Sequence, residues 1–185
     1  MITEIRKVFL QNATNAGKAG AEKFVPGADD AYGVRLPVIN ELAKKYKTGG
    51  LKLAEELWKG KYEEKLLAGK IIGHVAKQDP PATLKLIKKL SGNINDWAVC
   101  DTLGQQGTKK IAASHTEELF KLSGELIRSK DLWQRRLAIV LIEWHTREKK
   151  HHAKIKSLLN KVRNDKEYYV KKAVSWIERN LEKKR

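Results

Sequence analysis

The sequence predicts an all-α protein arranged as an α-solenoid, in which pairs of helices stack one after another. Residues with high helix propensity, namely Ala, Leu, Lys and Glu, dominate the chain, and only four prolines interrupt it. No segment alternates apolar and polar residues in the way that a half-buried strand does. Apolar residues instead recur at helical spacing. This spacing predicts helices over residues 2–19, 34–46, 50–59, 61–77, 80–90, 94–107, 115–128, 131–147, 151–163 and 166–183.

The longer helices recur with the period of a helical repeat. They begin near positions 62, 94, 132 and 167, so successive starts are 32, 38 and 35 residues apart. Each follows a shorter amphipathic helix and ends in basic residues. Stacked helix pairs of this kind line a concave surface with their second helices. We therefore expect one repeat domain over 1–185, with an N-terminal helix and turn in 1–30 and the repeats in 31–185.

The charge of the chain favours a polyanionic partner. Lys and Arg total 38 against 22 Asp and Glu, which gives a formal net charge of +16 and a pI near 9.8. A hydrophobic content of 41% is too high for a disordered basic tail, so the excess charge belongs to a folded protein. Nucleic acid is the first candidate partner and an anionic membrane surface the second, while solubility is the alternative explanation.

Lysines end several of the second helices and would together make the concave surface a basic groove. Such a groove suits a phosphate backbone. Cations are also favoured at any helix C-terminus, so each lysine taken alone has a structural explanation. The lysines concerned are Lys109, Lys110, Lys149, Lys150, Lys183 and Lys184.

Several kinds of site are excluded by residue patterns. Cys100 is the single cysteine, so the sequence predicts no internal disulfide and no cysteine-based zinc site. The histidines show no metal-site spacing with carboxylates, and His151 and His152 fit a solvated turn. No phosphate-binding glycine motif and no serine-nucleophile signature occurs. No apolar run is long enough for a signal peptide or a membrane span, so we expect a cytoplasmic protein.

The segment NDWAVCDTL places an aromatic residue and an acid on one helix face. Trp97 and Asp101 are four residues apart and so lie one above the other, whereas Val99 and Leu103 point to the opposite side. Gly104 lies beside the pair, where the missing side chain lets a bulky partner approach. Two interpretations remain open. Either the pair packs and hydrogen-bonds inside the stack, or it faces a ligand.

Two later helices carry residues that are hard to assign to packing. Trp176 lies off the apolar stripe of the last helix, near Tyr169 and Lys172. An aromatic ring among cations suits contact with a sugar, a base or a nucleic-acid backbone, and the alternative is a cap on the end of the stack. Arg136 either meets a phosphate or pairs with a carboxylate, for which Glu143 is the candidate.

Five segments are similar to segments of a known family, and the last three also occur in its order and at a similar spacing. They are YGVRLPVINELAKKY, LWKGKYEEKLLAGKIIG, NDWAVCDTL, LWQRRLAIV and YYVKKAVSWIERN. Over residues 30–184 the chain resembles the AlkD-like family of DNA alkylation repair enzymes, which are HEAT-like helical-repeat DNA glycosylases. Any one segment alone is a weak match, whereas the set is specific.

The resemblance implies positions for the chemistry. Asp101 matches the family's essential aspartate, and Trp97 matches the tryptophan one turn before it. Arg136 matches the groove arginine more closely than Arg135 does, and Trp176 matches the tryptophan of the final motif. The implied reaction is hydrolysis of the N-glycosidic bond of positively charged N3- and N7-alkylated purines, without metal or organic cofactor. The implied roles are cation stabilisation and water positioning by Asp101, sugar and backbone packing by the tryptophans, and phosphate binding by Arg136.

The partner that the resemblance implies is double-stranded DNA containing alkylated purines, bound by a monomer with no membrane and no obligate protein partner. Such a protein would be cytoplasmic and nucleoid-associated when bound to DNA. Two alternatives are a non-catalytic HEAT-like protein that recognises damaged or branched DNA, and a protein-binding helical scaffold. The acid favours the enzyme, because a carboxylate in a DNA groove repels phosphate. The residues expected to bind DNA are Arg135, Lys109, Lys110, Lys149, Lys150, Tyr169 and Lys172.

Overall fold

Helices make up the regular secondary structure of the computed structural model, which describes residues 1–183. No strand occurs within this range, so the predicted all-α class is confirmed. Short 3₁₀ or π-helical turns connect or extend several helices. The α-helices are α1 (Ile2–Asn12), α2 (Asn15–Phe24), α3 (Leu36–Tyr46), α4 (Gly50–Leu57), α5 (Tyr62–Val75), α6 (Pro80–Leu90), α7 (Trp97–Asp101), α8 (Thr116–Leu126), α9 (Leu132–Leu141), α10 (His152–Asn160) and α11 (Tyr168–Glu182).

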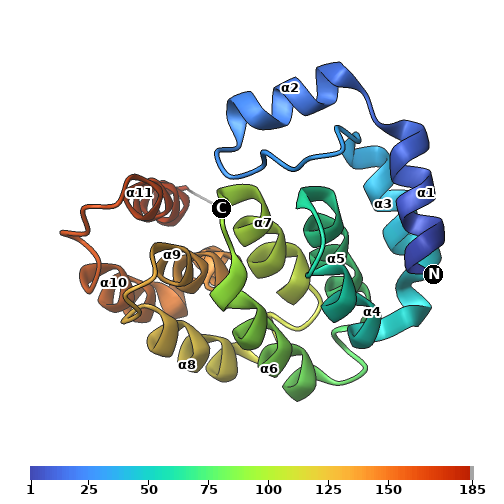
Figure 1. Cartoon of the computed structure of the whole chain (residues 1–185). Helices are drawn as coiled ribbons and strands as arrows, with labels where there is room; N and C mark the ends of the chain where they lie inside the picture. The colour runs from blue at the N-terminus through green and yellow to red at the C-terminus, as the bar shows by residue number, and fades with distance from the viewer. Residues whose placement is uncertain (184–185) are drawn as a thin grey trace.

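The helices from α4 onward form two rows (Figure 1). One row, here called the inner row, contains α5, α7, α9 and α11, and each of these helices packs against the next. The other row contains α4, α6, α8 and α10, with α4 packed on α5 and α8 packed on α9. At the N-terminal end α3 packs on α5, whereas α2 crosses over the inner row and touches α7 through a hydrogen bond.

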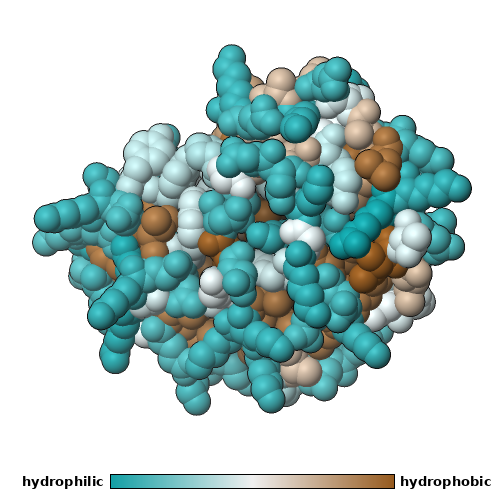
Figure 2. All heavy atoms as spheres, viewed as in Figure 1, coloured by the Kyte–Doolittle hydropathy of each residue, from teal (hydrophilic) through white to brown (hydrophobic). Residues whose placement is uncertain are grey.

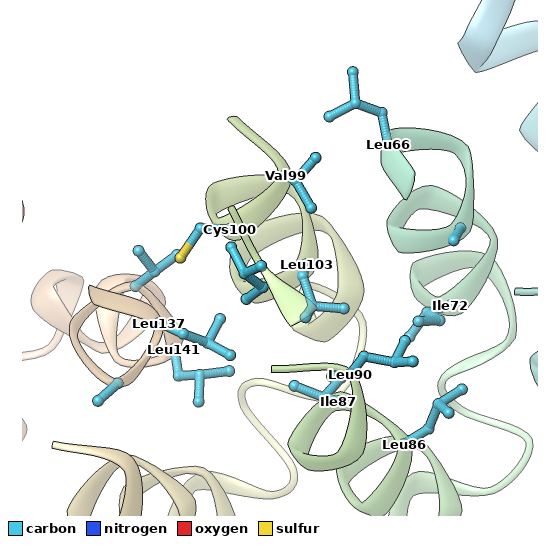
Figure 3. Packing of buried hydrophobic residues seen from close by; sticks show 14 of the residues in the cluster. Leu66, Ile72, Leu86, Ile87, Leu90, Val99, Cys100, Leu103, Leu137 and Leu141 are labelled. Carbon is cyan, nitrogen blue, oxygen red and sulfur yellow. The ribbon is translucent and has the colours of Figure 1, made fainter. Parts of the chain in front are cut away.

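A single cluster of buried apolar side chains extends from Ile5 in α1 to Ile177 in α11. Figure 3 shows its centre, where side chains from α5, α6, α7 and α9 meet around Leu103. Leu103 is fully buried, and truncation of such a leucine to alanine typically costs about 2 to 5 kcal/mol. Apolar packing therefore holds the inner-row helices in fixed positions, and with them the polar side chains that they project.

The helix predicted over 2–19 is in fact two helices. Thr14 interrupts it, because the Thr14 Oγ1 atom accepts a hydrogen bond of 3.0 Å from the Gly17 N–H and caps the start of α2. α2 then continues to Phe24. The prediction of one helix was wrong because it rested on the spacing of apolar residues, and this spacing does not reveal a threonine that caps a second helix.

The helix predicted over 94–107 starts later and changes type. It begins at Trp97, where the Asp96 carboxylate accepts the Val99 N–H at 2.8 Å and caps the first turn. After α7 the chain passes into a π-helical turn over Thr102–Gln106. Single π-helical turns are rare and frequently occur at functional sites.

The helix predicted over 131–147 also changes type. α9 ends at Leu141, and a 3₁₀ helix, η4 (Glu143–Arg147), follows it. A second 3₁₀ helix, η5 (Lys149–His151), leads into α10. Glu148 between these two short helices has an extended backbone, so the 3₁₀ spiral is not continuous in this part of the chain.

Gly104 marks the contact between the π-helical turn and α9. It is buried, and a Cβ atom at this position would lie 2.5 Å from Val140 Cγ1. The bulky partner that Gly104 admits is therefore the Val140 side chain of α9, and the close approach of the two elements requires glycine.

Hydrophilic side chains cover most of the face shown in Figure 2, and the apolar patches between them are small. Charged residues make up 32% of the sequence, so this surface is expected. No helix within residues 1–183 has both the length and the apolar character needed to cross a membrane.

Candidate active site

Asp101 and Arg136 form a two-point ion pair that joins three helices of the inner row. Arg136 Nε donates to Asp101 Oδ1 and Arg136 Nη2 donates to Asp101 Oδ2, both at 2.9 Å. The third nitrogen, Nη1, donates to the carbonyl oxygen of Tyr169 at 2.7 Å. Because the planar guanidinium matches a carboxylate in this arrangement, the pair fixes the orientation of the Asp101 carboxylate.

Partial burial sets the electrostatics of this pair. The Asp101 side chain is 21% exposed and the Arg136 side chain is 7% exposed. Burial raises the pKa of Asp101 above its ordinary value, while the hydrogen bonds and the charge of Arg136 oppose that rise. The carboxylate is thus an accessible negative group that is held in the charged form chiefly by one neighbouring arginine.

Glu143 is not the partner of Arg136, so that candidate pairing was wrong. The Glu143 carboxylate instead accepts hydrogen bonds from Gln105 at 3.2 Å, Asn180 at 3.2 Å and Arg147 at 3.3 Å. These donors come from the π-helical turn, α11 and η4 respectively. Glu143 therefore ties the end of α9 to its neighbours and leaves Arg136 free to hold Asp101.

The Asp101 carboxylate lines a hollow of about 520 Å³, here called the carboxylate hollow. Its walls come from α2, α5, α7, the π-helical turn and the segment that leads into α3. Trp97 stands beside Asp101 in the same wall. The remaining lining residues are Gly17, Ala21, Val34, Arg35, Leu36, Tyr62, Glu63, Leu66, Lys70, Ala98, Thr102, Gln105 and Gln106.

A second hollow, of about 280 Å³, lies on the other side of Trp97 and is here called the aromatic hollow. Trp97 is anchored in the wall between the two hollows, because its Nε1–H donates to the Phe24 carbonyl oxygen at 3.1 Å. The Phe24 ring itself is exposed. The other lining residues are Arg136, Tyr168, Tyr169 and Lys172.

A third hollow, of about 460 Å³, is rich in cations and is here called the lysine hollow. Lys110 Nζ donates to the His74 carbonyl oxygen at 3.0 Å across it. Burial lowers the pKa of Lys70, and burial together with nearby lysines lowers the pKa of His74. The shift of His74 thus reflects nearby positive charge as well as burial, whereas that of Lys70 reflects burial alone. The cationic lining residues are Lys44, Lys70, Lys109 and Lys110.

The three hollows are contiguous along the inner row. The carboxylate hollow shares Trp97 with the aromatic hollow, and it shares Lys70 and Gln106 with the lysine hollow. Together they form what we call the site surface. Seven of the residues singled out in the sequence line it, namely Trp97, Asp101, Lys109, Lys110, Arg136, Tyr169 and Lys172.

Other residues singled out in the sequence lie elsewhere. Trp176 is half-buried against the apolar core and lines none of the three hollows. Arg135 donates to Asp165 and to the carbonyl oxygens of Ser129 and Lys130, so its guanidinium faces the protein.

The remaining lysines of the expected basic groove also lie off the site surface. Lys149 and Lys150 are exposed in η5, and Lys150 pairs with Glu148 at 2.7 Å. Lys183 Nζ donates to Asn180 Oδ1 at 2.8 Å. Lys184 lies outside the described residues.

Two adjacent acids that the sequence analysis missed position one wall of the site. Glu63 accepts the backbone N–H groups of residues 32–34 at 2.7 to 3.0 Å, and Glu64 accepts bonds from Arg6 and the Tyr32 hydroxyl. These bonds hold the segment between α2 and α3 against α5. The signal was the motif YEEKLL, in which two acids at a helix start resemble ordinary helix-dipole partners.

Lysines clustered on one surface are typical of proteins that bind nucleic acid. Residues 5–185 match the family model described as DNA alkylation repair enzyme, so the chain belongs to this family. The resemblance drawn from the five sequence segments is thereby confirmed. Membership places the chain among proteins named for the repair of alkylation damage in DNA. No curated protein and no solved structure gives a match.

Proposed function

We propose that this protein is a DNA glycosylase that removes positively charged N3- and N7-alkylated purines from double-stranded DNA. One observation carries the proposal, namely that Arg136 holds the Asp101 carboxylate at 2.9 Å in the wall of a hollow beside Trp97. A protein that only bound DNA would gain nothing from a carboxylate directed at the groove, because it repels phosphate. Family membership supports alkylation damage as the biological context.

Asp101 supplies the electrostatic part of the proposed reaction. When the glycosidic bond breaks, its electron pair leaves with the cationic base, which departs neutral, and the sugar becomes oxocarbenium-like. The carboxylate stabilises that developing cation and orients a water molecule. The water oxygen then bonds to C1′ of the deoxyribose, and the proton that it loses passes to Asp101 and on to solvent. No metal or organic cofactor is part of this scheme.

Arg136 acts in this scheme as a positioning residue. The resemblance implied that it holds a phosphate, but Nε, Nη1 and Nη2 all donate to partners within the protein. We therefore assign it the orientation of Asp101. Trp97 packs against the deoxyribose, since it separates the carboxylate hollow from the aromatic hollow. Trp176, one turn beyond Lys172 on α11, contacts the backbone beside the reacting nucleotide.

The DNA backbone follows the site surface in this proposal. Phosphates meet Lys109 and Lys110 of the lysine hollow on one side, and Lys172 with Tyr169 on the other side. The two rows of helices then act as a solenoid of HEAT-like pairs whose concave face is this surface. A net charge of +16 adds long-range attraction to DNA.

Base release tests the proposal directly. Wild-type protein is incubated with methylated duplex DNA, and released 7-methylguanine and 3-methyladenine are measured beside Asp101→Asn and a no-enzyme reaction. We expect release above the spontaneous rate by wild type and not by the variant. No release, together with salt-sensitive binding to duplex DNA, would assign the chain to non-catalytic DNA recognition. In that case the Asp101–Arg136 pair is a structural link between α7, α9 and α11.

A further inference from the structure

A cluster of potential metal ligands lies at the turn between α9 and α10, away from the site surface. His145, Glu148 and His151 each present one ligand atom, and these three atoms lie within 4.8 Å of one another. His145 is fully buried, while the side chains of His151 and Glu148 are 14% and 44% exposed. Two imidazoles and a carboxylate thus converge where one side remains open to solvent.

The break between two short 3₁₀ helices accompanies the convergence. His145 lies in η4 and His151 in η5, and Glu148 joins the two helices with an extended backbone at φ −117° and ψ 113°. On a continuous α-helix positions 145 and 151 would point in different directions. The sequence predicts an α-helix to residue 147 and a solvated turn at His151. In that arrangement the residues of the motif HTREKKH do not converge, so the motif does not indicate a metal site.

The buried histidine lacks a partner for one ring nitrogen. His145 Nε2 is buried and has no hydrogen-bond partner among the described residues. Buried polar atoms in folded proteins are almost always paired with protein, water or an ion, so this atom needs an explanation. The Phe120 ring lies 5.2 Å from the His145 ring and 5.7 Å from the His151 ring, centroid to centroid. Its contact restricts the rotation of both imidazoles.

We propose that His145, Glu148 and His151 bind a divalent transition-metal ion, with Zn²⁺ as the preferred ion, and that the bound ion fixes the α9–α10 turn. Zn²⁺ takes imidazole nitrogen and carboxylate oxygen at about 2.0 to 2.2 Å, so ligand atoms around a tetrahedral ion lie about 3.4 Å apart. The ligand atoms, which lie within 4.8 Å of one another, therefore need to approach by up to about 1.4 Å to complete the site, and solvent fills the fourth position. Mg²⁺ and Ca²⁺ prefer all-oxygen ligand sets and are not expected to bind.

Two nearby lysines oppose metal binding at this site. Lys150 pairs with Glu148 at 2.7 Å and must be displaced. An exposed pair of this kind contributes little stability, so displacement is feasible. Lys154, which pairs with Glu117 at 2.6 Å, adds a further positive charge to the surroundings of His145.

A metal at this position would support the last helices of the inner row. Glu143, in the same 3₁₀ segment, accepts hydrogen bonds from Asn180 of α11 and from Gln105 of the π-helical turn. An ion that rigidifies η4 and η5 therefore also rigidifies the contact between α9 and α11. The role is structural and independent of the base-release chemistry.

The test titrates tag-free protein, stripped with chelator and dialysed, with ZnCl₂ alone in a calorimeter at pH 7.5. We expect one ion per chain with a dissociation constant at or below about 10 µM. We also expect the melting temperature to rise by about 5 °C or more when free Zn²⁺ is 100 times the dissociation constant. Absence of binding at this strength overturns the proposal, and so does a heat that MgCl₂ reproduces.

Substitutions decide whether these residues hold the ion. Glu148→Gln and His151→Gln change partly exposed side chains and are each expected to weaken Zn²⁺ binding at least tenfold, whereas His115→Gln is the matched histidine control. Lys150→Ala removes the competing cation and is expected to tighten binding about two- to fivefold. Equal affinity in the Glu148→Gln, His151→Gln and His115→Gln variants would show that Zn²⁺ binds elsewhere on the chain.

Discussion

Two adjacent arginines in the motif LWQRRLAIV form two aspartate pairs of similar chemistry with different surroundings. Arg136 holds Asp101 through two bonds of 2.9 Å. Arg135 holds Asp165 through bonds of 2.6 and 3.2 Å, and its Nη1 also donates to backbone carbonyls of the preceding loop. The Asp101 side chain is 21% exposed and faces a hollow, whereas the Asp165 side chain is 8% exposed.

The two carboxylates also differ in their electrostatics. Burial raises the pKa of Asp101, and Arg136 only partly opposes the rise. Burial acts on Asp165 too, but hydrogen bonds from Arg135 and from the Glu167 N–H outweigh it, so the pKa of Asp165 is lowered. We infer that the closed pair serves stability and the open pair serves the reaction. Because Asp101 borders the carboxylate hollow, its carboxylate remains accessible to the sugar cation that develops in the proposed reaction.

Neutralising each aspartate should produce the largest contrast. Asp101→Asn removes the charge that stabilises the sugar cation, and we expect single-turnover release of 7-methylguanine to fall at least about 100-fold. Asp165→Asn should leave the rate per folded molecule within about threefold of wild type. Release is measured under enzyme excess, and folding is checked by circular dichroism. Equal losses in the two variants would break the distinction between the open and the closed pair.

Removal of Arg135 should mainly affect stability. Arg135→Met leaves the buried Asp165 carboxylate without its cation and leaves two carbonyl oxygens unpaired. We expect the free energy of unfolding to fall by about 3 kcal/mol, measured by urea denaturation.

Arg136→Lys keeps the positive charge but loses the two-point geometry. It should instead lower the release rate about tenfold or more, with little change in the affinity for undamaged DNA.

The pH dependence should separate the two pairs further. In the proposed reaction Asp101 acts as a carboxylate, so release should fall as pH drops through a midpoint above the ordinary aspartate pKa of 3.8. Arg136→Gln should move that midpoint upward. The hydrogen bonds and the positive charge of Arg136, which oppose the rise in the pKa of Asp101, are lost in this variant. Rates are taken after subtraction of spontaneous depurination at each pH.

Asp96 provides the control for this profile. It caps α7, and burial raises the pKa of Asp96 to about 6. A midpoint that shifts in Asp96→Asn and stays fixed in Arg136→Gln would assign the titration to Asp96 and contradict the role of Asp101. Asp165→Asn should leave the midpoint unchanged, since the pKa of Asp165 lies below the ordinary range.

The sequence was sufficient to place Trp97 and Asp101 on one helix face, because residues four positions apart lie about one turn apart on a helix. It was also sufficient for the all-α class. It was not sufficient to assign the partners of Arg135 and Arg136, which are neighbours on one helix about 100° apart. Asp101 and Asp165 lie 35 and 30 residues away from them in sequence, and only the packing of the inner row decides which arginine reaches which acid.

The local type of helix was the second feature that could not be predicted from the sequence. The apolar pattern near residue 145 is equally compatible with an α-helix and a 3₁₀ helix over a few residues, and the choice depends on the neighbours that bind Glu143. The chain breaks at Glu148 between η4 and η5, and the ligand atoms of His145, Glu148 and His151 lie close together around this break. Lys109 and Lys110 line the lysine hollow, and their contact with DNA remains a prediction.

The smallest expected effect distinguishes lysines on the site surface from lysines beyond it. Lys109→Gln and Lys110→Gln each remove one phosphate contact, so each should reduce the slope of log affinity against log salt by about 0.9. Lys149→Gln should leave the slope unchanged, because Lys149 lies in η5 outside the three hollows. The slope is measured by fluorescence anisotropy with one labelled duplex at several salt concentrations. An equal loss of slope in Lys149→Gln would contradict the proposed path, because DNA would then contact η5 as well as the site surface.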